Sequence, residues 1–138
     1  MRRFFAIVFL GLSGYGFSVT PFASGKLILD KKLATHAKGI RTLFLVVYDL
    51  ESKRPMPYGA KKVELKKDAS GVFYTFNLDS NSLNKMSYHG ATPKKLRIKA
   101  RLDKDGSAGM DQKGDITGEL SPVELGSKGL TITLNKVK

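Results

Sequence analysis

The stretch Lys94–Val137, KKLRIKARLDKDGSAGMDQKGDITGELSPVELGSKGLTITLNKV, decides the fold. It begins with strict alternation, in which apolar side chains occupy every second position and cationic ones occupy the positions between them. The apolar set is Leu96, Ile98, Ala100 and Leu102, and the basic set is Lys95, Arg97, Lys99 and Arg101. A period of two indicates a β-strand with its apolar face toward a core and its basic face toward water. An Asp- and Gly-rich turn and the segment GDITGELSPVELG follow, before a second alternating strand in which Leu130, Ile132 and Leu134 face inward.

The chain before this stretch has several more short segments of strand character, separated by turn signals. They are Lys26–Leu29, Arg41–Leu50, Ala60–Lys66 and Val72–Leu78. The nearly continuous apolar run within Arg41–Leu50 predicts a strand buried on both faces at the centre of the fold. Only Asp30–Ala37 has helical spacing, enough for one or two turns with Asp30 as the N-cap. About seven short strands predict an all-β antiparallel sandwich, immunoglobulin- or cupredoxin-like in outline, with one short helix.

The first 25 residues have the composition of a signal peptide. Arg2 and Arg3 form a positive n-region, Phe4–Leu12 is apolar, and Ala23-Ser24-Gly25 places small residues at a cleavage site. The continuous apolar run is shorter than the roughly 20 residues that span a membrane as a helix. We therefore expect a signal peptide over residues 1–25 and a periplasmic or envelope-associated β-sandwich domain over 26–138, without a transmembrane segment. The alternative is an uncleaved membrane anchor.

Charge and cysteine content limit the classes of function. The chain has no cysteine, which excludes disulfides, thiolate metal sites, thiol nucleophiles and the lipid-modified cysteine of a lipoprotein. Of the 24 Lys and Arg residues, Arg2 and Arg3 lie in the leader, so the mature domain has 22 against 12 acidic residues, a net charge of +10. This excess favours an acidic protein or an anionic envelope surface as partner. Nucleic acid is not expected, because an exported chain seldom meets it.

Two groups of residues are candidates for partner binding. The first is the basic strand face Lys95, Arg97, Lys99 and Arg101, which Lys61, Lys62, Lys66 and Lys67 would extend if their strands are neighbours. This basic face would attract acidic partners, and the attraction would weaken with salt. The alternative is that its cations only keep an outer sheet face soluble and block edge pairing. The second group comprises loop residues suited to gripping an apolar helix, namely Met56, Pro57, Tyr58, Met86, Tyr88 and His89. Met56 is equally suited to plugging one end of the sandwich.

Enzymatic and metal sites find little support in the sequence. The chain has two histidines and no Ser or Cys in a nucleophile motif, so we expect neither catalysis nor a cofactor. The aspartates from Asp103 to Asp115 fail the calcium-loop pattern, because Ala108 and Gly114 occupy positions 6 and 12, and we expect them to cap turns. Met86 and His89, with Met56 and Met110, would suit Cu(I), although packing also explains Met86 and Met56.

Four segments, in this order, carry a resemblance to a known family: GKLILDKKLATHAKGIRTLFLVVYD, RPMPYGAKKVEL, FNLDSNSLNKM and ARLDKDGSAGMDQKGDITGE. Together they resemble the C-terminal periplasmic domain of the CcmI/CcmH family of c-type cytochrome maturation (biogenesis) factors. The resemblance implies a non-enzymatic, chaperone-type protein that binds apocytochrome c or partners of the haem-ligation machinery. In that family the domain follows membrane helices and a helical repeat domain, whereas here a signal peptide precedes it. The alternatives are a basic envelope-binding module, with anionic lipid or polymer as ligand, and a periplasmic copper-handling protein.

Overall fold

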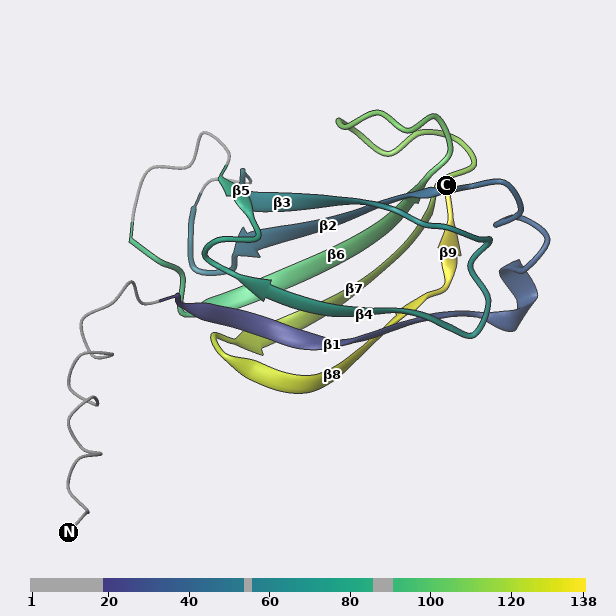
Figure 1. The fold of residues 1–138 in the computed structure, drawn as a ribbon. Helices are drawn as coiled ribbons and strands as arrows, with labels where there is room; N and C mark the ends of the chain where they lie inside the picture. Colours follow the sequence, from purple (N-terminus) through teal and green to yellow (C-terminus); the bar gives the residue numbers. More distant parts are fainter. Residues whose placement is uncertain (1–18, 54–55, 86–90) are drawn as a thin grey trace, which may run out of the picture.

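The computed structural model describes residues 19–53, 56–85 and 91–138, which form two β-sheets packed face to face (Figure 1). The predicted all-β sandwich is therefore confirmed, with nine strands in the described residues rather than about seven. The smaller sheet has the order β4-β1-β8, and its strands are β1 (Pro21–Leu29), β4 (Val72–Asp79) and β8 (Ser127–Leu134). The larger sheet has the order β5-β3-β2-β6-β7-β9, and its strands are β2 (Thr42–Asp49), β3 (Pro57–Glu64), β5 (Asn84–Lys85), β6 (Lys95–Asp103), β7 (Ile116–Glu124) and β9 (Lys136–Val137).

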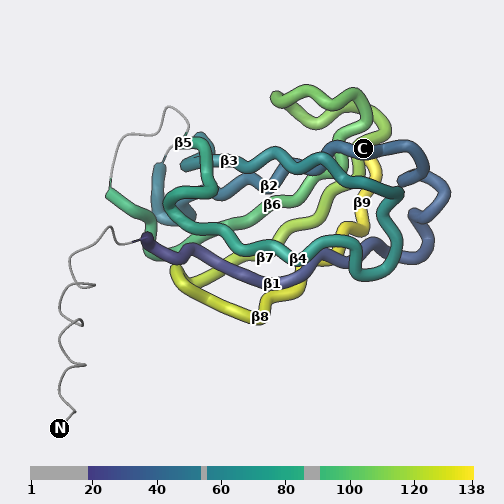
Figure 2. Tube along the Cα trace, viewed as in Figure 1, coloured from purple at the N-terminus to yellow at the C-terminus, as the bar shows by residue number. Residues whose placement is uncertain are grey.

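The end of the chain joins the two sheets along one edge. β8 pairs in parallel with β1, whereas the other strand pairs of the described residues are antiparallel. The chain then crosses over, so that β9 pairs with β7 of the larger sheet (Figure 2). β7 and β8 approach so closely that a Cβ atom on Gly118 would lie 2.1 Å from the carbonyl oxygen of Thr133. Only glycine permits this approach at position 118.

The core lies between the sheets and is built by the inward faces of the alternating strands. The apolar residues predicted to face inward from β6 are fully buried, as are Ile132 and Leu134 of β8, while Leu130 is partly buried. β4 contributes Phe76 and Leu78, but its first residue, Val72, is 55% exposed. The period-two alternation thus predicted the inward faces of β6 and β8 correctly.

β2 differs from its prediction as a strand buried on both faces. Its inward side chains, Leu43, Leu45 and Val47, are fully buried in the core. Its other face carries Phe44, Val46 and Tyr48, of which Val46 and Tyr48 are partly exposed. No other strand of the described residues covers this face, because the smaller sheet packs on the opposite side.

Two further segments also differ from expectation. β1 begins at Pro21, so residues 21–25, which were assigned to the signal peptide, pair with β4 and β8 instead of preceding the domain. The segment GDITGELSPVELG was assigned no strand, but it contains the nine-residue strand β7, in which Gly118 lies at a close approach to β8 and Pro122 lies at a register shift opposite β6.

The predicted short helix is present, as a single 3-10 turn rather than two turns. A 3-10 helix covers Lys31–Leu33, and the side chain of Asp30 accepts a hydrogen bond from the backbone N–H of Lys32 at 3.1 Å. Within the described residues no helix is long and apolar enough to cross a membrane.

Candidate functional site

The outward face of the larger sheet carries three rows of side chains that run across β3, β2 and β6. Read from β3 through β2 to β6, the rows are Lys62–Phe44–Arg101, Ala60–Val46–Lys99 and Pro57–Tyr48–Arg97. In each row the residue of β2 is apolar or aromatic, and the residue of β6 is a cation. The face therefore has an apolar centre along β2 beside a cationic strip along β6.

Aromatic rings of β2 hold the neighbouring cations in place. The guanidinium carbon of Arg97 lies 3.9 Å from the centre of the Tyr48 ring. Arg101 of β6 and Lys62 of β3, the two strands beside β2, approach the Phe44 ring to 5.0 Å and 6.0 Å from its centre. At such distances the negative face of an aromatic ring attracts a cation, so these side chains lie along the sheet surface instead of extending into solvent.

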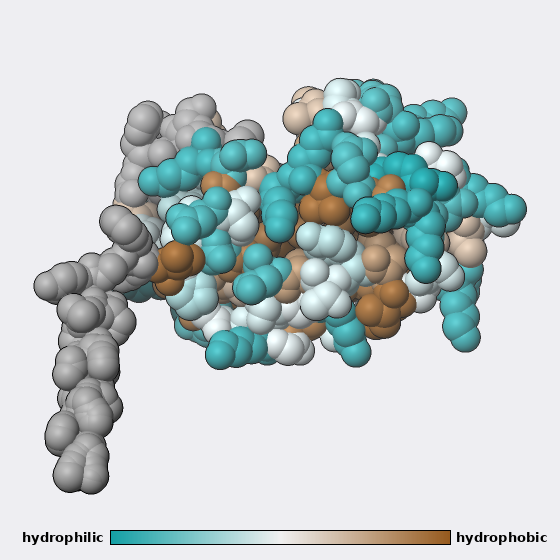
Figure 3. All heavy atoms as spheres, viewed as in Figure 1, coloured by the Kyte–Doolittle hydropathy of each residue, from teal (hydrophilic) through white to brown (hydrophobic). Residues whose placement is uncertain are grey.

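A groove of about 680 Å³ lies over this face, between the sheet and the loop of residues 104–115 that joins β6 to β7. Its floor is formed by Phe44, Val46 and Tyr48, and Met110 of the loop, 84% exposed, lies at its border. The charged residues among the described lining are the cations Lys62, Lys99, Arg101 and Lys138 and the acid Asp111. In Figure 3 the long hydrophilic side chains of this view leave apolar surface visible between them. The groove thus combines an apolar floor with a mainly cationic border.

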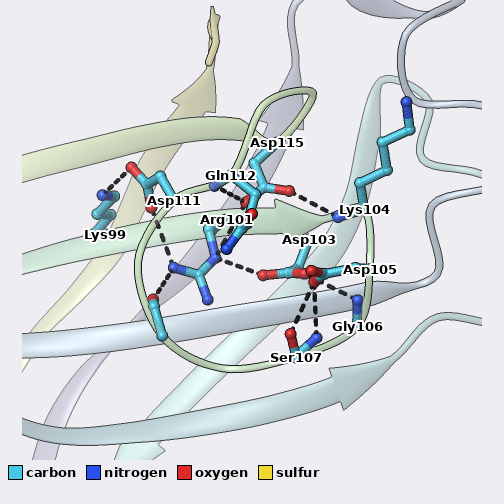
Figure 4. A network of polar contacts seen from close by, with 11 residues as sticks. Lys99, Arg101, Asp103, Lys104, Asp105, Gly106, Ser107, Asp111, Gln112 and Asp115 are labelled. Atoms are coloured by element: carbon cyan, nitrogen blue, oxygen red, sulfur yellow. Dashed lines mark hydrogen bonds and ion pairs between the residues drawn. The ribbon is translucent and has the colours of Figure 1, made fainter.

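Arg101 and Asp111 fasten the loop of residues 104–115 to the sheet (Figure 4). Nη1 of Arg101 donates to the carbonyl oxygen of Gly109 at 2.6 Å and to Oδ1 of Asp111 at 3.1 Å. The other carboxylate oxygen of Asp111 accepts a hydrogen bond from Nζ of Lys99 at 2.6 Å. Two outward cations of β6 therefore position one wall of the groove.

Beneath this contact Arg101 is surrounded by two buried carboxylates. Its Nε lies 2.9 Å from Oδ2 of Asp103 and 3.9 Å from Oδ2 of Asp115. The 2.9 Å contact is an ion pair in which the N–H is not aligned for a hydrogen bond. Only 5% of Arg101 is exposed, and Asp103 and Asp115 are 1% and 0% exposed. The single cation thus compensates two carboxylates that water does not reach.

Burial and pairing move the pKa values of these aspartates in opposite directions. Burial raises the pKa of Asp103, and the hydrogen bond shared with Asp105 and the negative charge of Asp115 raise it further, against the opposing effect of Arg101. Burial also acts to raise the pKa of Asp111, but the hydrogen bonds from Lys99 and Arg101 outweigh it and hold that pKa below its ordinary value. Because its pKa is lowered and that of Asp103 is raised, Asp111 stays ionised to a lower pH than Asp103.

The basic strand face of β6 was expected to point into water and is instead largely charge-paired. Arg97 donates to Glu119 of β7 at 2.7 Å, Lys99 binds Asp111, and Arg101 is buried. Lys95 is exposed at the start of β6 and lies apart from the groove lining. The acidic partners come from β7 and from the loop, so alternation within β6 gave no sign of them.

The basic face of β6 was expected to extend onto the lysines near β3 on the condition that the two strands are neighbours, and this condition is not met. β2 lies between β3 and β6, so these strands are not neighbours. Lys62 shares the outward face with the cations of β6, whereas Lys61 has the opposite parity on β3. Lys66 and Lys67 follow the end of β3 and border a different hollow near Val72.

Few of the predicted loop contacts lie at the groove. Pro57 begins β3 and lines the groove, while Met56 precedes it and is partly exposed. Tyr58 is 6% exposed and packs on Phe22, so its prediction as a contact residue is wrong: strand alternation turns it into the core. The remaining three, Met86, Tyr88 and His89, lie outside the described residues.

The aspartates of the loop cap backbone groups, as the sequence analysis favoured. Asp103 accepts from the N–H of Gly106 at 2.9 Å, and Asp105 from the N–H of Ser107 at 3.1 Å. Asp115 accepts from the N–H groups of Lys104 and Gln112 at 2.8 Å and 2.7 Å. In the described part of the chain no group of three or more His, Cys, Asp or Glu residues is arranged to hold a metal ion.

Sequence reasoning missed the floor of the groove and much of its border, namely Phe44, Val46, Tyr48, Lys138 and, as a border residue, Met110. The sequence did contain a signal that could have identified the floor. Because the outward positions of β6 are cationic, that sheet face had to be open, and every apolar outward residue of a neighbouring strand would then lie on it.

Comparisons with protein-family models, with curated proteins and with solved structures found no match. What the groove can bind therefore follows from its own residues. The aromatic and aliphatic floor suits apolar side chains. Lys99 and Arg101 are already paired with aspartates, and Lys62 lies 3.7 Å from the exposed Glu64, so the border attracts carboxylates mainly through Lys62 and the exposed Lys138.

Proposed function

We propose that this protein is an exported, non-enzymatic accessory protein of c-type cytochrome maturation, which binds apocytochrome c or a partner of the haem-ligation machinery through the groove. The observation that carries the proposal is the apolar floor of Phe44, Val46 and Tyr48, bordered by cations on an outward sheet face. An unfolded or partly folded client presents both apolar and acidic side chains, which such a surface binds together.

The two parts of the groove have different tasks in this proposal. Burying the partly exposed Val46 and Tyr48 supplies affinity, at about 25 cal/mol for each Å² of apolar surface removed from water. Lys62, of which the side chain is 51% exposed and forms only a solvent-exposed 3.7 Å ion pair with Glu64, attracts and orients an acidic segment and adds mainly to the association rate. Affinity should therefore survive moderate salt, although association slows.

The resemblance selects the class of client, and its segments converge on the groove. The segment ARLDKDGSAGMDQKGDITGE supplies Arg101, Met110 and Asp111, which form one wall. The segment RPMPYGAKKVEL supplies Pro57, Ala60 and Lys62 on the opposite side. That separate resembling segments meet at one surface supports a role for this surface in the family's task.

Binding to matched forms of one client tests the proposal. Residues 19–138 are titrated with a c-type apocytochrome and with its haem-loaded form, at about 0.05 M and 0.3 M salt, beyond the range of easy screening. We expect the apo form to bind at both salt concentrations and the haem-loaded form to bind at least tenfold more weakly, because folding hides its apolar segments. Equal binding of both forms that disappears at 0.3 M salt would overturn the proposal.

An envelope-binding module is the second candidate, and the net charge of +10 outside the leader favours it. Vesicles of neutral lipid with and without about 30% anionic lipid provide its test, in the same two salt concentrations. Charge-dependent vesicle binding without preference for the apocytochrome would place this candidate first. The copper-handling alternative rested on Met86 and His89, which lie outside the described residues.

A further inference from the structure

We propose that the leader is removed between Ser18 and Val19, so that the mature protein begins at Val19 and keeps the whole of β1. The inference rests on the exported location in the proposed function and goes beyond it, because it replaces the expected cleavage after Gly25. In the cleavage, water adds across the Ser18–Val19 peptide bond, which leaves a carboxylate on Ser18 and an amino group on Val19. The catalyst is a membrane-bound signal endopeptidase.

Phe22 is the first reason why residues 21–25 belong to the mature domain. Its side chain is 0% exposed, and its ring centre lies 5.4 Å from that of Tyr58 in the other sheet. Its carbonyl oxygen accepts a hydrogen bond from the N–H of Gly126 at 2.7 Å. Cleavage after Gly25 would remove one of the largest fully buried side chains and leave the Tyr58 ring against a cavity.

Backbone pairing gives a second, independent reason. The carbonyl oxygen of Thr20 accepts from the N–H of Ser80 at 2.9 Å, and the N–H of Thr20 donates to Oγ of Ser80 at 3.0 Å. Pro21 pairs with Asp79, and Ala23 pairs with residues on both of its neighbouring strands. Since β1 is the central strand of the smaller sheet, a product starting at Lys26 would lose half of the strand that joins β4 to β8.

The sequence offers a suitable cleavage site just before this ordered segment. Gly16-Phe17-Ser18 has small residues at the first and third positions before the proposed bond, as signal endopeptidases require. Val19 is 42% exposed and precedes the first paired residue, Thr20. The earlier triplet Gly14-Tyr15-Gly16 has the same spacing of small residues, but cleavage after it would leave Phe17, the last residue of the apolar run, on the mature chain. Ala23-Ser24-Gly25 has the same small-residue pattern, but it does so because β1 packs closely there: a Cβ atom on Gly25 would lie 2.2 Å from the carbonyl oxygen of Leu130.

The test is the N-terminus of the full chain after export. Residues 1–138 are produced in a Gram-negative bacterium, and the periplasmic protein is examined by intact mass and N-terminal sequencing. We expect a single product that begins at Val19. Ser18→Leu should abolish this product, whereas the matched Ser13→Leu within the apolar region should leave it unchanged.

Three other results would overturn the inference, and they separate its failure from that of the proposed function. A product that begins at Lys26 or at Phe17 would refute the Ser18–Val19 site but leave the exported location intact. An unprocessed chain in the membrane fraction would refute both the site and the proposed free periplasmic protein. Client binding by purified residues 19–138 is measured separately and does not depend on any of these outcomes.

Discussion

Arg101 and Asp111 connect the loop of residues 104–115 to the sheet through a hydrogen-bonded ion pair of 3.1 Å between Nη1 and Oδ1. The same carboxylate binds Lys99 at 2.6 Å, so one acid pairs with two cations and places a wall of the groove. The position of this wall, and with it the shape of the groove, therefore depends on a few polar contacts rather than on apolar packing.

Asp111→Asn is expected to loosen that wall. The amide cannot accept charge-assisted hydrogen bonds from both cations, so we expect a loss of about 1–2 kcal/mol in the free energy of unfolding and faster amide exchange in residues 104–115. Urea unfolding and hydrogen exchange measure the two effects. The matched variant Asp105→Asn keeps a side-chain oxygen that can accept the hydrogen bonds from Ser107 and Asp103, and at this exposed position it should cost under about 0.5 kcal/mol. Equal effects of the two substitutions would contradict the assigned role of Asp111.

The contribution of Asp111 should depend on pH in a defined direction. Its pKa is held low in the folded protein, so its stabilising effect is present above the unfolded value of about 3.9 and is lost as pH falls through the folded value. The raised pKa of Asp103 has the opposite sign, because the folded protein favours its protonated form. The difference in unfolding free energy between the wild type and Asp111→Asn should stay constant from pH 7 to 5 and shrink below about pH 4. A difference that persists undiminished at pH 3 would show that Asp111 acts by shape rather than by charge.

Arg101→Met should lower the free energy of unfolding far more than expected for a residue that the sequence predicted to face water. The substitution leaves Asp103 and Asp115 buried without a cation, which costs about 3–5 kcal/mol in comparable cases. Arg97→Met is the matched control, since Arg97 pairs with the exposed Glu119 and its loss should cost about 1 kcal/mol or less. Denaturant unfolding of both variants gives the comparison.

A double substitution keeps this prediction testable if Arg101→Met does not fold. Replacing Asp103 by Asn as well removes one uncompensated charge, so the double variant should be more stable than Arg101→Met alone. A double variant that is less stable would contradict the view that buried charge causes the loss.

The sequence predicted those parts of the fold that alternation within one strand determines. β6 and the inward half of β8 follow from their own period of two. β7 was missed because Gly118 and Pro122 are typical of turns, and the reason for Gly118, the close approach of β8, involves residues distant in sequence. The start of β1 was missed because PFASG shows no alternation and has the small residues of a cleavage site.

The candidate site was predictable only in part, for a related reason. Periodicity placed the cations of β6 on one face, but their acidic partners belong to β7 and to the loop of residues 104–115. The run containing Phe44 and Tyr48 was compatible with burial on both faces or on one. The choice depends on what covers the larger sheet, which no local pattern encodes.

Removing residues 19–25 should destabilise the domain strongly. Loss of the buried Phe22 side chain alone costs about 3–5 kcal/mol, and the shortened β1 loses pairing with both neighbouring strands. Residues 26–138 should therefore unfold at a much lower temperature than residues 19–138, or fail to fold, whereas Val19→Ser in the longer chain should have little effect. Equal thermal stability of the two chains would contradict the role of Phe22 in the core.

The most direct test of the central claim is the affinity of two single-charge variants for a c-type apocytochrome. Val46→Glu places a carboxylate on the floor of the groove, and Lys128→Gln changes the net charge by the same unit at an exposed position on β8. With circular dichroism confirming that both variants fold, we expect the Kd to rise at least tenfold for Val46→Glu, about 1.4 kcal/mol, and less than twofold for Lys128→Gln. If both variants bind as tightly as the wild type, or weaken equally, the groove is not the client-binding surface.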